Sequence, residues 1–235
     1  MAGTLYLIPT NLSDPFTPQS ILPQDVIATA RRLDYYIAEN ARTARAFLKT
    51  LEIDRPIQGI SIRELNGRQE KNILLEMLQP LLDGHDVGLV SEAGAPGVAD
   101  PGADIVALAH ELGLTVSPLV GPSSILLALM ASGLNGQRFA FHGYLPQEKN
   151  ARTKSIAELE RESRQRNMTQ LFIETPYRNQ VLLADLIQTL APSTRLCVAC
   201  DLTGAGEAII RRDVSAWKKS PVELGKVPAL FLFLA

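Results

Sequence analysis

The chain has 235 residues, of which 46% are hydrophobic and 20% are charged, and its formal net charge is −2. This composition is close to the globular average, so it excludes a collagen-like, low-complexity or wholly disordered chain, and the small net charge excludes a polycation built to coat nucleic acid. The charge is uneven, since residues 1–120 hold 9 Lys and Arg against 15 Asp and Glu, whereas residues 121–235 hold 14 against 10. An acidic half and a basic half indicate two domains with different partners.

In the first half, short apolar runs alternate with segments of helical spacing. The runs that read as strands are 5–8, 35–38, 87–90 and 114–116, and the segments that read as helices are 69–82 and 104–112. This alternation is typical of a parallel sheet covered by helices. We therefore predict an N-terminal α/β domain, residues 1–118, with a mostly parallel sheet.

The second half repeats the alternation with more closely spaced strands. Its expected strands and helices are 125–131 (helix), 139–141 (strand), 151–167 (helix), 171–173 (strand), 179–190 (helix), 196–199, 207–210 and 229–234 (strands). The short turn at 203–206 indicates some antiparallel pairing. We predict a C-terminal α/β domain, residues 119–235, with a mixed sheet.

One segment imitates a membrane span, because no charged residue occurs between Gly113 and Gln137. Pro118 and the pair Gly121-Pro122 interrupt it, so strand, loop and buried helix are favoured over a span. The N-terminal residues lack the pattern of a signal peptide, since the first basic residue is Arg31. We expect a protein without a membrane segment.

The two cysteines, Cys197 and Cys200, form a C-x-x-C pattern that is open to two readings. The first is a redox pair or half of a zinc site. The second is two residues of a strand, which at this spacing point to opposite faces. The strand is favoured because no second pair exists and the three histidines lack ligand spacing, so we predict no metal. Two unpaired thiols are typical of the cytoplasm.

Three loops of small residues, 9–14, 91–102 and 120–124, each follow an expected strand. Ligands of parallel sheets bind beyond the carboxyl ends of the strands, and glycine lets a ligand approach the backbone. Neither a P-loop nor G-x-G-x-x-G occurs. The alternatives are a tight connection in which Asp100 caps the next helix, and a Ser nucleophile at 123–124 that lacks the G-x-S-x-G context. Three such loops on one rim favour a ligand site.

Six segments in a fixed order carry a resemblance to a known family. They are 5–14, 38–43, 89–102, 121–124, 143–146 and 174–178. The chain resembles the tetrapyrrole (corrin/porphyrin) methylase superfamily of S-adenosylmethionine (SAM) methyltransferases. Within it, the chain is most similar to the ribosomal RNA small subunit methyltransferase I group, which methylates a cytidine 2′-hydroxyl. The pattern Ala-Gly-x-Pro-Gly followed by Asp-Pro-Gly, within 93–102, is the most specific part.

The resemblance implies two α/β domains with SAM in the cleft between them, a homodimer, and RNA or the small ribosomal subunit as a partner. It implies cofactor contacts in both halves of the chain: Leu12, Gly94, Ala95, Val98, Ser123 and Ser124, then Ile173, Cys200, Pro228 and Ala229. Cys200 would then only line a pocket.

The chain departs from the group at several positions. It reads Glu39-Asn40-Ala41-Arg42 where the group usually has Glu-Asp-Thr-Arg, Glu92 replaces an Asp, and His142 stands where an acidic residue is common. The resemblance also implies that the C-terminal extension of full-length members is missing. These departures bear on the substrate more than on the cofactor.

A methyl group on a sulfonium is already activated, so the protein mainly aligns donor and acceptor, and a base near a ribose hydroxyl helps. The candidate bases are Glu39, Asp14 and Glu174, each of which is alternatively a helix cap or an ion-pair partner. Arg42 and Arg178 are candidate phosphate ligands, or else members of surface salt bridges. We take Glu39, Asp14 and Arg42 as the catalytic candidates.

The expected helix at 151–167 and its flank carry basic residues that suit RNA phosphates, but glutamates interleave with them, as on a solvated helix. The basic residues are Lys149, Arg152, Lys154, Arg161, Arg164 and Arg166. Three functions stay open. They are an RNA 2′-O-methyltransferase, which is favoured, a small-molecule (tetrapyrrole-type) methyltransferase, and a SAM-binding paralogue without catalysis.

Overall fold

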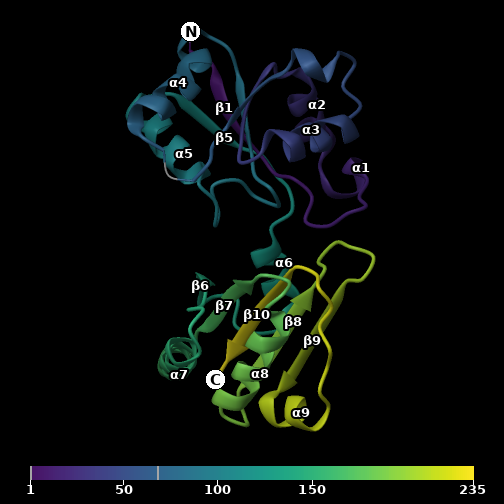
Figure 1. Cartoon of the computed structure of the whole chain (residues 1–235), viewed down its shortest axis with the longest axis vertical. Helices are drawn as coiled ribbons and strands as arrows, with labels where there is room; N and C mark the ends of the chain where they lie inside the picture. Colours follow the sequence, from purple (N-terminus) through teal and green to yellow (C-terminus); the bar gives the residue numbers. More distant parts are fainter. Residues whose placement is uncertain (1, 68) are drawn as a thin grey trace. The chain divides into compact units, whose positions relative to one another are not determined.

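The computed structural model describes residues 2–67 and 69–235, and the chain divides into two compact units (Figure 1). The first unit ends at Ser123 and the second runs from Ser124 to Ala235, where the sequence analysis placed the division after residue 118. Within the described residues, no helix has the length and apolar character that a membrane crossing requires. The uncharged segment 113–137 instead contains a strand, a loop and a short helix, as expected.

The first unit is one sheet of five parallel strands in the order β3-β2-β4-β1-β5. Its strands are β1 (Thr4–Ile8), β2 (Tyr35–Ala38), β3 (Ser61–Glu64), β4 (Val87–Val90) and β5 (Thr115–Pro118). Its helices are α1 (Pro18–Ile21), α2 (Gln24–Arg32), α3 (Ala41–Thr50), the 3-10 turn η1 (Ile57–Gly59), α4 (Lys71–Leu82) and α5 (Gly102–Glu111).

Helices cover both faces of this sheet (Figure 1). Side chains alternate between the two faces of the sheet along β1. Ile8 therefore packs in a core with α2 and α3, whereas Leu5 packs on the other face with α4 and α5. From β1 the chain crosses β4 to reach β2, and from β4 it crosses β1 to reach β5. The connections after these two neighbouring strands therefore leave in opposite directions. Such a switch point is where open α/β sheets bind ligands, at the carboxyl ends of the strands.

The second unit has a mixed sheet in the order β6-β7-β10-β8-β9. Strands β6 and β7 are parallel, and the other neighbours are antiparallel. In chain order its elements are α6 (Ser124–Ser132), β6 (Phe139–Tyr144), α7 (Lys149–Arg166), β7 (Thr169–Glu174), α8 (Asn179–Thr189), β8 (Arg195–Cys200), β9 (Ala208–Asp213), α9 (Val214–Lys219) and β10 (Ala229–Leu234).

The core of the second unit gathers around β10, whose six residues are all buried. Phe172 stacks on Phe231, and the indole Nε1 of buried Trp217 donates a 3.0 Å hydrogen bond to the Leu196 carbonyl oxygen. The buried final strand predicted at 229–234 is thus confirmed. At the edge, the pairing of β6 with β7 shifts register after Phe141, at a bulge where Gly143 has φ +63°.

Candidate functional site

The loops that follow β1 and β4 are joined at the switch point of the first unit. The Thr10 amide donates to the Gly94 carbonyl oxygen at 3.0 Å, and the Thr10 hydroxyl donates to the Ser91 carbonyl oxygen at 3.3 Å. The Ser91 hydroxyl in turn donates to the Gly94 carbonyl oxygen at 3.1 Å. Sequence reasoning missed this contact, because Thr10 and Gly94 are ordinary loop residues until the strands are paired.

Close packing brings the loop after β5 against the same rim. Gly94 has φ +75°, and a Cβ there would lie 3.0 Å from Leu12 Cδ2 and 3.5 Å from the Pro122 carbonyl oxygen. A Cβ on Gly121 would lie 2.4 Å from Pro9 Cβ. The three loops predicted to share one rim therefore do so, and their glycines are what allows the close approach.

The other first-half candidates extend from this rim. Ala95 is half-buried and Val98 is exposed on the loop after β4. Ser123 is the last residue of the first unit, and Ser124 is the first residue of α6, both half-buried. The small side chains thus line a loop surface and the start of a helix.

Asp100 closes the long loop between β4 and α5. Its carboxylate accepts hydrogen bonds from the Gly97 amide at 2.9 Å and from the Gly102 amide at 2.7 Å. Burial raises the pKa of Asp100, although both hydrogen bonds act to lower it. Asp100 does bond to the first residue of α5, as a cap would, but it also fixes the turn at Gly97, whose φ is +80°.

Glu39 lies at the carboxyl end of β2, half-buried, in a group of three carboxylates. Burial is the largest cause that raises the pKa of Glu39, followed by the negative charges of Asp100 and Glu92, while a hydrogen bond from the Glu92 amide opposes the shift. The Glu92 carboxylate accepts a hydrogen bond from the Thr43 hydroxyl. A carboxylate whose pKa is raised is a better proton acceptor.

The altered segment after Glu39 retains a structural role. The Asn40 side-chain oxygen accepts from the Arg42 amide at 2.8 Å and from the Thr43 amide at 3.3 Å, so it caps α3. An asparagine caps a helix about as well as the aspartate usual in the group. Arg42 is exposed, and within the described ranges its side chain has no ion-pair partner, so the alternative of a surface salt bridge is not seen there.

The other two candidate bases differ from Glu39 in their surroundings. Asp14 is exposed and accepts a 3.0 Å hydrogen bond from the Asn11 side chain. Glu174 is buried and is bound by the Thr175 amide at 2.6 Å and by Arg178 at 2.6 Å. For Glu174 and Arg178 the ion-pair alternative is therefore the one observed.

The second-half candidates come together at one end of the mixed sheet. Ala229 pairs with Cys200 on one side and with Glu174 on the other, and the Pro228 carbonyl oxygen accepts a 2.9 Å hydrogen bond from Asp201. Cys200 and Ala229 face the core of the second unit, whereas Ile173 lies on the opposite face of the sheet. These four residues are neighbours along the strands, but their side chains are divided between two faces.

The cysteines are strand residues, which contradicts the redox or half-zinc reading. Cys197 and Cys200 lie on β8 and are both buried. Burial raises the pKa of Cys197 to about 11 and also raises the pKa of Cys200. Neither is thus a reactive thiolate at neutral pH. In the part of the chain that the structure describes, no cluster of three His, Cys, Asp or Glu residues is placed to hold a metal ion.

One of the basic residues of α7, Arg152, is not available to RNA. It is 6% exposed, forms a 2.6 Å ion pair with Asp185, and donates to the Gln147 carbonyl oxygen at 2.6 Å. Arg164 and Arg166 pair with glutamates one turn earlier. Both are exposed, as are Lys149, Lys154 and Arg161.

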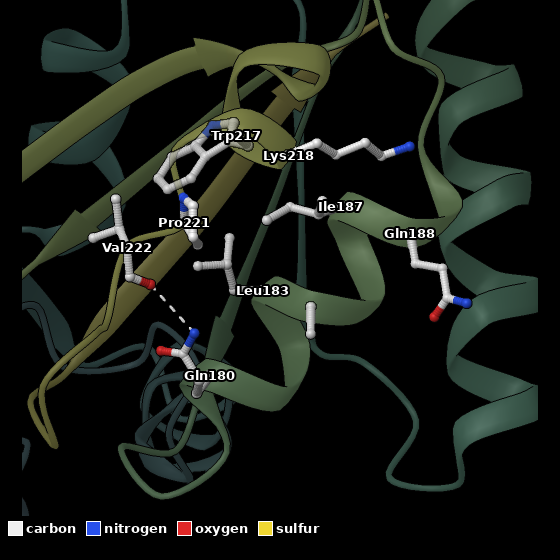
Figure 2. Close-up of a pocket in the computed structure, with 9 residues that line it drawn as sticks. Gln180, Leu183, Ile187, Gln188, Trp217, Lys218, Pro221 and Val222 are labelled. Atoms are coloured by element: carbon white, nitrogen blue, oxygen red, sulfur yellow. Dashed lines mark hydrogen bonds between the residues drawn. The ribbon is translucent and has the colours of Figure 1, made fainter.

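A separate hollow of ≈ 450 Å³ lies between α8 on one side and α9 with the segment that follows it on the other (Figure 2). Its lining is mostly apolar and includes Leu183, Ile187 and Trp217. None of the candidate site residues lines it. It is therefore distinct from the rim of the first unit and from the sheet end of the second.

Two solved structures of methyltransferases share this fold over essentially their whole length. One is the uroporphyrin-III-C-methyltransferase from Thermus thermophilus, with a TM-score of 0.57, 16% identity, and coverage of 100% of this chain and 93% of that one. The other is the methyltransferase CobJ, with a TM-score of 0.62, 16% identity, and coverage of 99% and 94%. Such identities show the fold alone, a two-domain α/β fold of the tetrapyrrole methyltransferase type.

The sequence comparisons show the family. Residues 23–216 match the family Tetrapyrrole (Corrin/Porphyrin) Methylases, and the chain belongs to this family of methyltransferases. It is 31% identical to the ribosomal RNA small subunit methyltransferase I of Escherichia coli O157:H7 over 92% of this chain and 72% of the relative. It is 32% identical to the protein of the same name from Bacillus subtilis (strain 168), over 91% and 68%. The resemblance inferred from six segments is thus confirmed.

Proposed function

We propose that this enzyme transfers the methyl group of SAM to a ribose 2′-hydroxyl of small-subunit ribosomal RNA. The curated relatives that are about 30% identical along some nine-tenths of the chain carry the name ribosomal RNA small subunit methyltransferase I. The structural observation that carries the proposal is the rim of the first unit, where three loops of small residues meet at a switch point.

The residues of this rim fit SAM. Close packing at Gly94 and Gly121 holds the three loops together at the carboxyl ends of the strands, where open α/β sheets bind ligands. We assign Leu12, Gly94, Ala95 and Val98 to the cofactor, and Ser123 and Ser124 to its carboxylate, because the first amides of a helix favour an anion. In the second unit we assign Ile173, Cys200, Pro228 and Ala229 to the same ligand. When bound, SAM supplies a methyl group already activated by the sulfonium.

Glu39 is our candidate for the general base. Its carboxylate would accept the proton of the ribose hydroxyl, a task that a raised pKa favours. Arg42, exposed one residue inside α3, would hold a phosphate of the RNA, and Asp14 is the alternative base. Glu39→Gln should lower kcat by about 10²–10⁴-fold with little change in SAM affinity, whereas Asp14→Asn should not.

We also propose a homodimer, which the resemblance supports, and a cytoplasmic location, which the two unpaired thiols support. Sedimentation of the purified chain tests the first inference, and fractionation of cells tests the second. A monomer at all concentrations would contradict the homodimer.

The decisive experiment supplies labelled SAM together with small ribosomal subunits or with tetrapyrroles. We expect label in the RNA as a 2′-O-methyl nucleoside, and none with Gly94→Val, whose side chain would meet Leu12. Label in the tetrapyrrole would instead establish a small-molecule methyltransferase. SAM binding without transfer would indicate a non-catalytic paralogue, and no SAM binding at millimolar concentration would contradict every form of the proposal.

A further inference from the structure

An exposed aromatic ring and a lysine from distant segments meet at one end of the second unit. Tyr177 lies in the loop between β7 and α8 and is 81% exposed. The Lys226 ammonium lies 5.6 Å from the centre of its ring. Lys226 belongs to the segment that runs from α9 to β10, so the pair joins two parts of the chain about 50 residues apart.

The first turn of α8 holds this segment in place. Gln180 donates to the Val222 carbonyl oxygen at 3.2 Å, a bond drawn in Figure 2, and accepts from the Leu224 amide at 2.9 Å. Asn179, which is 1% exposed, donates to the Val227 carbonyl oxygen at 2.7 Å. These three bonds fix the backbone on both sides of Lys226, so the lysine is positioned beside the ring by the fold.

The pair itself offers a cation for a phosphate. Its cation is Lys226, whereas Lys218 and Lys219 lie on α9, at the opposite end of the sheet. Next to Tyr177, the guanidinium of Arg178 neutralises buried Glu174. An exposed aromatic ring offers a face on which any base can stack, and an adjacent cation attracts the phosphate. Single-stranded RNA is the ligand that needs both.

We propose that Tyr177 and Lys226 form a stacking site for an unpaired nucleotide of the substrate RNA. This inference rests on the proposed function and deepens it, since it names unpaired bases as what the second unit recognises. The site adjoins the second-unit cofactor candidates: Tyr177 follows Ile173 and Glu174 on the β7 side, and Lys226 precedes Pro228 and Ala229.

The test measures binding of a fluorescently labelled single-stranded oligouridine, about 12 nucleotides long, to the full chain with SAM present. Tyr177→Ala should weaken binding by about 5- to 150-fold, whereas Tyr177→Phe, which keeps the ring, should stay near wild type. Lys226→Gln should reduce the log–log salt slope of binding by about 0.7, because one phosphate contact is lost. The matched control is Phe139→Ala, an exposed aromatic residue on the edge strand β6, which should leave binding unchanged.

Several outcomes would overturn the stacking site. These are a wild-type chain that does not bind the probe, a Tyr177→Ala variant that binds as tightly as wild type, an equal loss with Phe139→Ala, or equal competition by duplex RNA. Calorimetry with SAM on each variant shows whether the protein is still folded and cofactor-competent. Methylation of ribosomal subunits by the wild type tests the proposed function separately, so the two failures are distinguishable.

Discussion

The two units support their candidate residues by different physical means. In the first unit, loops after parallel strands are joined by a backbone hydrogen bond between Thr10 and Gly94. They pack closely because Gly94 and Gly121 have no side chain. In the second, the candidates lie on the strands or, for Pro228, directly before one, and the buried ion pair Arg152–Asp185 joins two of the helices. The first arrangement is sensitive to added atoms, and the second to removed charges.

The largest effect is expected where a charge is removed from the second unit. Arg152→Ala leaves Asp185 buried without its partner, so we expect a loss of about 3–5 kcal/mol in the free energy of unfolding. Denaturant unfolding measures it. Arg164, on the same helix, is 61% exposed and lies 3.9 Å from a glutamate that keeps two other hydrogen bonds, so Arg164→Ala should change stability by less than about 1 kcal/mol. Equal losses would mean that burial does not distinguish the two pairs.

The next effect is expected where an atom is added to the first unit. Gly121→Ala places a methyl group against Pro9, so we expect a loss of about 1–3 kcal/mol in stability together with the loss of SAM binding. Thermal unfolding and calorimetry check the two parts. Gly59→Ala is the matched control, because a Cβ there meets nothing within 4 Å. If Gly121→Ala still binds SAM, the rim of the first unit is not the cofactor site.

A smaller effect is expected from releasing the loop after β4. Asp100→Ala removes the acceptor shared by the Gly97 and Gly102 amides, but it also removes the penalty of burying a carboxylate. We expect stability to fall by only about 1 kcal/mol while SAM affinity falls clearly. Asp104→Ala, exposed in the first turn of α5, should leave the affinity unchanged. Calorimetry measures the SAM affinity of both variants. An unchanged affinity in Asp100→Ala would mean that SAM binding does not depend on the hydrogen bonds to the Asp100 carboxylate.

The smallest effect concerns the pH dependence of stability. Because the pKa of Glu39 is raised, the folded chain binds this proton more tightly than the unfolded chain, so stability falls as the pH rises from the ordinary glutamate range through the raised pKa. Glu39→Gln removes the titrating group and with it this loss of stability. We expect the variant to exceed wild type in stability at neutral pH, with a difference that shrinks toward acid. Unfolding curves over pH 4–8 measure it, and parallel curves would contradict the raised pKa.

Apolar pattern was enough to place much of the fold. Strands β2, β4 and β10 have the predicted bounds because each is a run of apolar residues buried between layers. Strand β3 was missed since Ser61, Arg63 and Glu64 are exposed at a sheet edge and give no such run. Helices α2, α3 and α9 were also missed. In α3 the polar residues outnumber the buried ones, and its start depends on the Asn40 cap.

The candidate site was predictable in its loops but not in its electrostatics. Strand ends and small residues pointed to Gly94 and Gly121, because the position of a loop follows from the strand before it. The neighbourhood of Glu39, Glu92 and Asp100 depends on β2 lying beside β4, which the sequence does not state. The burial of Arg152 depends likewise on Asp185, which lies on another helix.

The bulge in β6 bears on how the protein behaves at high concentration. This strand is at the edge of its sheet and carries exposed aromatic residues at both ends, Phe139 and Tyr144. A regular edge strand of this kind can pair with a strand of another molecule. The register shift between Phe141 and Tyr144 interrupts the regular spacing of backbone amides and carbonyls, so an added strand would not meet a continuous edge. The kink thereby protects the chain against edge-to-edge aggregation.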